Sequence, residues 1–137
     1  MSIIDKIIKK HGSNKEPIVF IFDGIRLEFK RMNSASEIYR LRDECRIEAE
    51  KISKMPGPKL KNIWPAKNPE LCMHILLLHR NYLGVGEFAI SLADWCTLAE
   101  AMGPEFATLA ETYMNKHNAK HLELDVESGV IEEMEKN

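Results

Sequence analysis

The fold of this chain is decided by the stretch IVFIFDGIRLEF, residues 18–29. Two apolar runs flank Asp23-Gly24, a dipeptide that favours the two-residue type I′ turn of a β-hairpin. The turn predicts antiparallel pairing with this register: Phe22 opposite Ile25, Phe20 opposite Leu27 and Ile18 opposite Phe29. Because paired residues share a face of a sheet, this register collects all six apolar side chains on one face.

A charged helix is predicted to follow the hairpin directly. Ser34-Ala-Ser-Glu37 has the spacing of a capping box, in which the serine accepts a backbone N–H and the glutamate reaches back. Apolar residues then recur at three- and four-residue steps: Ile38, Leu41, Cys45, Ala49 and Ile52. Acidic residues interleave with arginines on the remaining positions, which predicts an exposed face with salt bridges. Pro56-Gly57-Pro58 ends the helix.

Three further helices are predicted in the second half of the chain. Asn68-Pro69-Glu70 supplies an N-cap, a first-turn proline and a first-turn acid. The helix that follows is apolar around nearly its whole circumference, so we expect it to be central. Ser91-Leu-Ala-Asp94 begins the next helix, and Gly103-Pro104 separates that helix from the last one. The predicted fold is α+β and mostly helical, with an N-terminal hairpin packed on about four α-helices.

A chain of 137 residues suits one domain. We expect a single globular unit over residues 1–117, with a short helix at 1–12, the hairpin at 17–32 and the helical part at 34–117. Residues 118–137 are acidic and are predicted to form a loosely ordered tail, although the alternation in Leu122–Val126 also suits a short edge strand.

The net charge of −2 hides two halves of opposite sign. Residues 1–67 carry 15 Lys and Arg against 9 Asp and Glu, which gives +6, and residues 68–137 carry 4 against 12, which gives −8. Such asymmetry can hold two parts of one fold together, guide head-to-tail contact between copies, or present a basic face to an acidic partner.

Cysteine usage and hydropathy indicate the cytoplasm. Cys45, Cys72 and Cys96 are far apart and lie in apolar helical patterns, which favours buried free thiols in a reducing compartment. No apolar run approaches the roughly 18 residues of a membrane span, and the N-terminus has no continuous apolar segment of the kind that a signal peptide needs. We expect neither export nor membrane insertion.

Catalytic motifs are missing from the sequence, which has no Gly-rich phosphate loop, no serine nucleophile elbow and no Cys-x-x-Cys. We therefore expect no enzyme activity and no cofactor. His117 and His121 are four residues apart, and Glu111 or Glu123 is a possible third metal ligand. The helical pattern fails at these histidines, so solvated side chains are the favoured interpretation and no metal site is predicted.

Nucleic-acid binding has one feature in its favour. Lys59, Lys61 and Lys67 surround Trp64, and basic side chains beside an aromatic are what backbone neutralisation and base stacking require. The pI of about 6.2 and the lack of a nucleic-acid motif argue against it. The indole of Trp64 is equally suited to anchoring its loop on the core.

The order of these motifs resembles the tail assembly chaperones of long-tailed bacteriophages and prophages. The resemblance rests first on the hairpin, on Gly24-Ile-Arg-Leu-Glu-Phe-Lys-Arg31 and on the Ser34-Ala-Ser-Glu37 and Leu41-Arg-Asp43 segments of the helix. Asn68-Pro-Glu-Leu71, the segment 91–99 and Gly103-Pro-Glu-Phe106 resemble the C-terminal helical half of that family. None of these is a diagnostic motif.

This resemblance implies a non-enzymatic chaperone in the cytoplasm of an infected or lysogenic bacterium. Its partner would be the tape measure protein, with the tail tube protein as a second candidate, and the family also implies self-association and a longer form made by ribosomal frameshifting. The leading alternative is a small nucleic-acid-binding or regulatory protein. A chaperone needs exposed apolar contacts. The candidates are Ile3, Ile4, Ile7 and Ile8 of the first helix, Val19 and Ile21 on the outward hairpin face, and Trp64, each of which also suits a core position.

Overall fold

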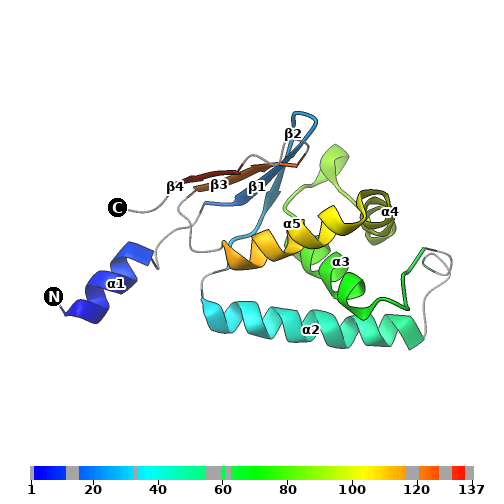
Figure 1. Ribbon diagram of the computed structural model, residues 1–137, viewed down its shortest axis with the longest axis horizontal. Helices are drawn as coiled ribbons and strands as arrows, with labels where there is room; N and C mark the ends of the chain where they lie inside the picture. Colours follow the sequence, from blue (N-terminus) through cyan, green and yellow to red (C-terminus); the bar gives the residue numbers. More distant parts are fainter. Residues whose placement is uncertain are drawn as a thin grey trace.

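The computed structural model describes residues 2–11, 16–32, 34–54, 60, 63–116, 121–126 and 131–134. Its elements in chain order are α1 (Ile3–His11), β1 (Ile18–Phe22), β2 (Ile25–Phe29), α2 (Ala35–Lys54), α3 (Pro69–Asn81), the 3-10 turn η1 (Gly86–Phe88), α4 (Leu92–Met102), α5 (Pro104–Asn115), β3 (His121–Asp125) and β4 (Ile131–Met134). Figure 1 shows the sheet as one layer with α2 to α5 on one side of it. The predicted α+β class, with a hairpin packed on helices, is confirmed.

The hairpin forms in the predicted register, with Phe22 opposite Ile25 and Ile18 opposite Phe29. Asp23 and Gly24 both have positive φ, 48° and 79°, as a type I′ turn requires. Ile18 and Phe29 are fully buried, so the apolar face of the hairpin is the face that meets the core.

The sheet is larger than the hairpin, because β3 and β4 extend it to the strand order β2-β1-β3-β4. β3 pairs in parallel with β1, and β4 pairs antiparallel with β3. Leu122 is 0% exposed and Leu124 is 6% exposed. Of the two interpretations of this segment, the loosely ordered tail is wrong for residues 121–125 and the strand is correct, although β3 is an inner strand and not an edge strand. The hairpin uses only one edge of β1, and the helical part brings the chain back to the other edge.

Two of the predicted helix caps form as expected. The Glu37 N–H donates to Ser34 Oγ at 3.2 Å, and the Asp94 N–H donates to Ser91 Oγ at 3.1 Å. Asn68 lies at the N-cap position of α3, as predicted, but its side chain makes no capping hydrogen bond. Pro69 favours the start of the helix at this position, because its ring fixes φ at a value that suits the first turn.

The core lies between the hairpin and the helices, with α3 at its centre. Every residue from Cys72 to Leu78 is buried, which confirms the predicted central helix. Phe29 reaches this core from β2, and its ring lies 5.9 Å from that of Trp95 on α4 and 5.8 Å from that of Tyr113 on α5. Through these aromatic contacts the sheet packs against α4 and α5.

The three cysteines are free and buried, as predicted. Burial raises the pKa of Cys72 and of Cys96 to about 11. Near neutral pH both groups are therefore thiols, and they pack as small apolar side chains.

Candidate partner-binding site

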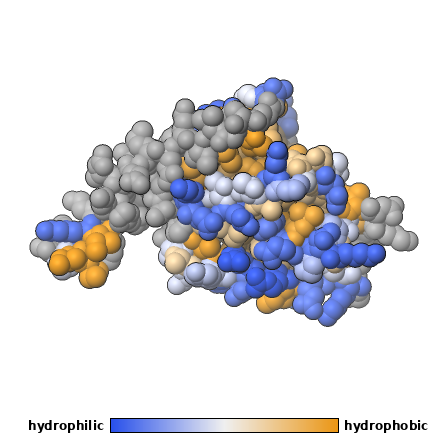
Figure 2. Space-filling model, in the orientation of Figure 1, coloured by the Kyte–Doolittle hydropathy of each residue, from blue (hydrophilic) through white to orange (hydrophobic). Residues whose placement is uncertain are grey.

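The apolar face of α1 is exposed, as its proposed role requires. Ile3, Ile4 and Ile7 are 76%, 64% and 52% exposed. Figures 1 and 2 show α1 projecting away from the layers of sheet and helices, with apolar side chains on its surface. Ser2 Oγ accepts the Asp5 N–H at 3.0 Å and so caps the helix. The side chain of Ile8 lies outside the described part of the chain.

The outward face of the hairpin is less open than predicted. Val19 is only 4% exposed and Ile21 is half-buried, so the expectation of an exposed contact is wrong for Val19. The reason is β3, which places Glu123 beside Val19 and Asp125 beside Ile21 in the sheet. Arg26 on β2 forms an ion pair with Glu123 at 2.6 Å, and long charged side chains of this kind cover apolar neighbours with their stems.

Trp64 belongs to the core. It is 7% exposed, and its indole Nε1 donates to Ser53 Oγ on α2 at 3.1 Å. The interpretation as a loop anchor is therefore correct, and Trp64 is not an exposed contact for a partner chain or for a nucleic-acid base. Lys59 and Lys61 lie outside the described residues.

A pocket of about 390 Å³ lies where three helices meet. Its walls are Ala35, Ile38, Tyr39 and Arg42 from α2, Glu70 and His74 from α3, and Glu111, Met114 and Asn115 from α5. This site could not be predicted from the sequence, because its residues come from three separate segments. The available signal was His74 itself, a titratable residue within the apolar run 71–78 of α3.

The polar atoms of this pocket are incompletely satisfied. The His74 side chain is 3% exposed, and its Nε2 lies 3.6 Å from Glu70 Oε1, which is too far for a hydrogen bond. Burial lowers the pKa of His74 and Arg42 lowers it further, while Glu70 and Glu111 act in the opposite direction. The imidazole is therefore neutral at pH 7. Neither His74 Nε2 nor Arg42 Nε finds a hydrogen-bond partner among the described residues, although both atoms are buried.

A second, more apolar hollow of about 460 Å³ continues along the same face of α2. Its walls are Arg46, Ala49, Glu50, Ser53, Lys54, Ala66 and Pro69. The two hollows follow successive turns of α2, since Arg46 lies one turn after Arg42 and Pro69 is the neighbour of Glu70 on α3. We call them together the α2 groove. It is polar at the His74 end and apolar at the Ala49 end.

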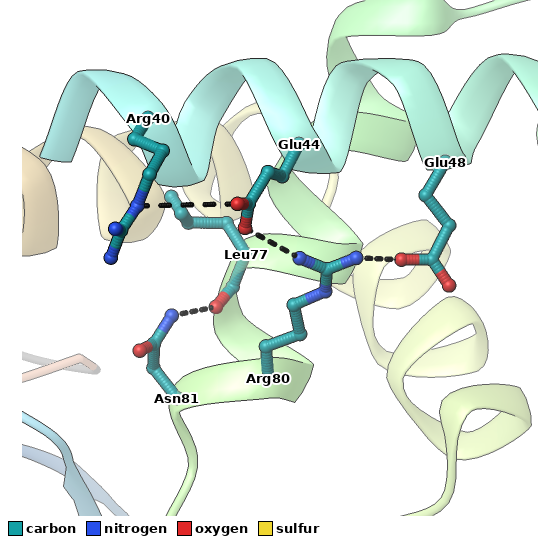
Figure 3. A network of polar contacts seen from close by, with 6 residues as sticks. All are labelled: Arg40, Glu44, Glu48, Leu77, Arg80 and Asn81. Carbon is teal, nitrogen blue, oxygen red and sulfur yellow. Dashed lines mark hydrogen bonds and ion pairs between the residues drawn. The ribbon is translucent and has the colours of Figure 1, made fainter. Parts of the chain in front are cut away.

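An ion-pair network on another side of α2 ties it to the end of α3 (Figure 3). Arg80 pairs with Glu44 at 3.5 Å and also with Glu48, and Arg40 lies 4.0 Å from Glu44. This confirms the predicted exposed face with salt bridges. Arg80 thus links α3 to two turns of α2, and because the side chains are partly exposed, these ion pairs add little to the stability of the fold.

The loop between α3 and α4 carries another apolar surface, which was not predicted from the sequence. Leu83, Val85 and Phe88 are 45%, 78% and 56% exposed. The loop has a defined shape, because the Leu83 N–H donates to Glu28 O at 2.9 Å and the Tyr82 hydroxyl donates to Phe88 O at 2.5 Å. These three side chains form a second exposed apolar surface, separate in sequence from α1.

In the described part of the chain, no three His, Cys, Asp or Glu residues are grouped as a metal ion would require. His117 lies outside that part, and so does the side chain of His121. None of the described helices combines the length and the apolar character needed to cross a bilayer.

Comparisons with known proteins gave no match: no protein-family model, no curated protein and no solved structure is similar to this chain.

Proposed function

We propose that this chain is a non-enzymatic tail assembly chaperone of a long-tailed phage or prophage. In the bacterial cytoplasm it would bind amphipathic helices of the tape measure protein before the tail tube assembles. The proposal starts from the resemblance of the hairpin, the capping box and the later helix starts to that family. The observation that carries it is the exposed apolar face of α1, whereas most of the other large apolar side chains among the described residues are buried or partly buried.

The physical argument concerns what such a helix needs. A helix of nine residues is marginal in water unless its apolar face is covered. Three isoleucines on α1 are more than half exposed, and exposed apolar patches mark interaction sites in soluble proteins. A partner helix that packs on Ile3, Ile4 and Ile7 would remove this surface from water and would stabilise both helices.

The test is co-expression with the tape measure protein encoded near this chain. We expect a higher soluble yield of that protein and a joint peak on a sizing column. Ile7→Lys should weaken the complex, because it places a charge on the apolar face of α1. Ile47→Lys is the matched control, since Ile47 on α2 is 56% exposed and Ile7 is 52% exposed.

No joint peak at micromolar concentration would contradict the proposal. Retention of the chain on DNA or RNA, falling steeply with salt, would instead favour the alternative of a small nucleic-acid-binding or regulatory protein. Trp64 would then not be the aromatic on which a base stacks, because it is buried.

A further inference from the structure

We propose that the α2 groove is a docking site for a helix of the partner chain, and that its His74 end takes a lysine or arginine from the last turn of that helix. The identity of the partner rests on the proposed function. The chemistry of the groove does not, because it follows from the residues that line it.

The residues that line the groove follow α2 over a length that suits a second helix. Its α2 residues recur at three- and four-residue steps from Ala35 to Lys54, so they lie along one face of the helix. These 20 residues span about 30 Å at about 1.5 Å per residue. Four to five turns of a second helix fit within roughly that length.

The His74 end is built mainly of acceptors. The carboxylate oxygens of Glu70 and Glu111 accept hydrogen bonds, and neutral His74 accepts through Nε2 when its proton is on Nδ1. A buried polar atom without a partner carries a desolvation cost, and an incoming N–H group at His74 Nε2 would remove it. Two carboxylates, Glu70 and Glu111, and one guanidinium, Arg42, act on this imidazole, so the excess of negative charge favours a cation over a neutral donor.

Arg42 explains why the last turn of a helix suits this end best. Its Nε is buried without an acceptor among the described residues. The last turn of an α-helix has backbone carbonyls with no partner inside the helix, and basic side chains are favoured there by the helix dipole. One helix end can therefore supply a carbonyl to Arg42 and a cation to Glu70 and Glu111.

The other end of the groove takes the apolar face of the same helix. Ala49, Ala66 and Pro69 line it with small, mostly apolar surfaces. An apolar side chain from an earlier turn of the docked helix would fill this hollow. The groove would therefore bind a helix with an apolar face in its earlier turns and a basic residue in its last turn, which is the helix-in-groove mode of recognition.

The test uses three fluorescent amphipathic peptides of about 18 residues, or about five turns. They are identical except for lysine, norleucine or glutamate in the last turn. Fluorescence anisotropy measures the affinity of each peptide for the full-length chain, for the variant E70Q/E111Q and for the control E100Q/E105Q. The control also removes two carboxylates, but from exposed sites on α4 and α5 outside the groove.

We expect wild type and control to bind the lysine peptide about tenfold or more tightly than the glutamate peptide. In E70Q/E111Q this preference should disappear, while the affinity for the norleucine peptide stays within about twofold. The imidazole NMR signals of His74 should shift when the lysine peptide is added to wild type. Equal binding of all three peptides to wild type, or an unchanged preference in E70Q/E111Q, would overturn the groove assignment.

Two further results separate this inference from the proposed function. If the tape measure complex forms and E70Q/E111Q binds as well as wild type, the groove assignment fails while the chaperone function stands. If the lysine peptide binds as expected but the tape measure protein does not, the function fails and the groove remains. If Ile7→Lys raises the affinity for the peptide, α1 is the natural occupant, and assignment of the groove to a partner helix is overturned.

Discussion

A substitution of Leu122 tests whether β3, which was predicted from the sequence as part of a loosely ordered tail or a short edge strand, belongs to the cooperative fold. The Leu122 side chain is 0% exposed in β3, the strand that pairs in parallel with β1. Leu122→Ala removes three carbon atoms, which lowers the free energy of unfolding by about 2.4 kcal/mol at about 0.8 kcal/mol for each buried methylene. The cavity that remains adds to this loss, so we expect about 3 to 4 kcal/mol in total.

Urea unfolding followed by tryptophan fluorescence measures this loss, because Trp95 is fully buried in the core that the sheet covers. The melting temperature should fall by about 10 °C. Ile4→Ala is the matched control, since Ile4 is 64% exposed, and it should change the free energy of unfolding by less than about 0.5 kcal/mol. If Leu122→Ala and Ile4→Ala unfold at the same urea concentration, β3 is not part of the cooperative fold.

Three further predictions concern helix capping, the hairpin turn and pH. Ser91→Ala should lower the free energy of unfolding by about 1 kcal/mol, because Ser91 Oγ caps α4. Asn68→Ala should lower it much less, because the Asn68 side chain makes no capping hydrogen bond. Urea titrations compare the two variants, and equal losses would contradict this account. Gly24→Ala should lower the free energy of unfolding by about 1 to 2 kcal/mol in the same titration, because φ is +79° at this position, even though a Cβ there would meet no other atom. No loss would show that the turn differs from type I′. Burial lowers the pKa of His74 and of His79 in the folded state, so protonation favours the unfolded state, and stability should be fully present above about pH 6.5 and decline as the pH falls below it. Urea titrations at pH 7 and pH 5 should show a smaller decline in the double variant His74→Gln, His79→Gln, and an identical decline in both proteins would refute this origin of the pH dependence.

The hairpin and most helix starts could be predicted because their causes are local. The Asp23-Gly24 turn sets the register of strands that are joined by two residues. Ser34 and Ser91 cap N–H groups three residues away. In each case the interacting groups are so close in the chain that residue type and spacing decide the geometry.

β3 and the burial of Val19 could not be predicted in this way. β1 and β3 are about 100 residues apart and pair only because four intervening helices return the chain to the sheet. Read alone, Leu122–Val126 is a short alternating segment, which is typical of an edge strand or an irregular tail. Once β3 occupies the free edge of β1, Val19 lies between two strands and loses its exposure.

Of the two candidate binding surfaces, one could be predicted from the sequence and the other could not. The isoleucine stripe of α1 was visible in the sequence, because a single helix displays it. The α2 groove was not visible, because Arg42, Glu70, His74 and Glu111 lie on three helices that meet only after packing. A helix shows its own faces in its sequence, but the sequence does not show which face a neighbouring helix will approach.

By itself, the sequence determined the α+β class, the hairpin and its register, the central apolar helix, the buried thiols and the apolar face of α1. Only the tertiary structure decided that the acidic C-terminal segment supplies an inner strand, that Val19 and Trp64 are buried, and that α2 is lined by a groove in which His74 Nε2 has no hydrogen-bond partner among the described residues. The physical reason is the separation along the chain of the residues that interact. Turns, caps and helical periodicity act over a few residues, whereas burial and pocket chemistry depend on segments that are distant in the chain and adjacent only when the core has formed.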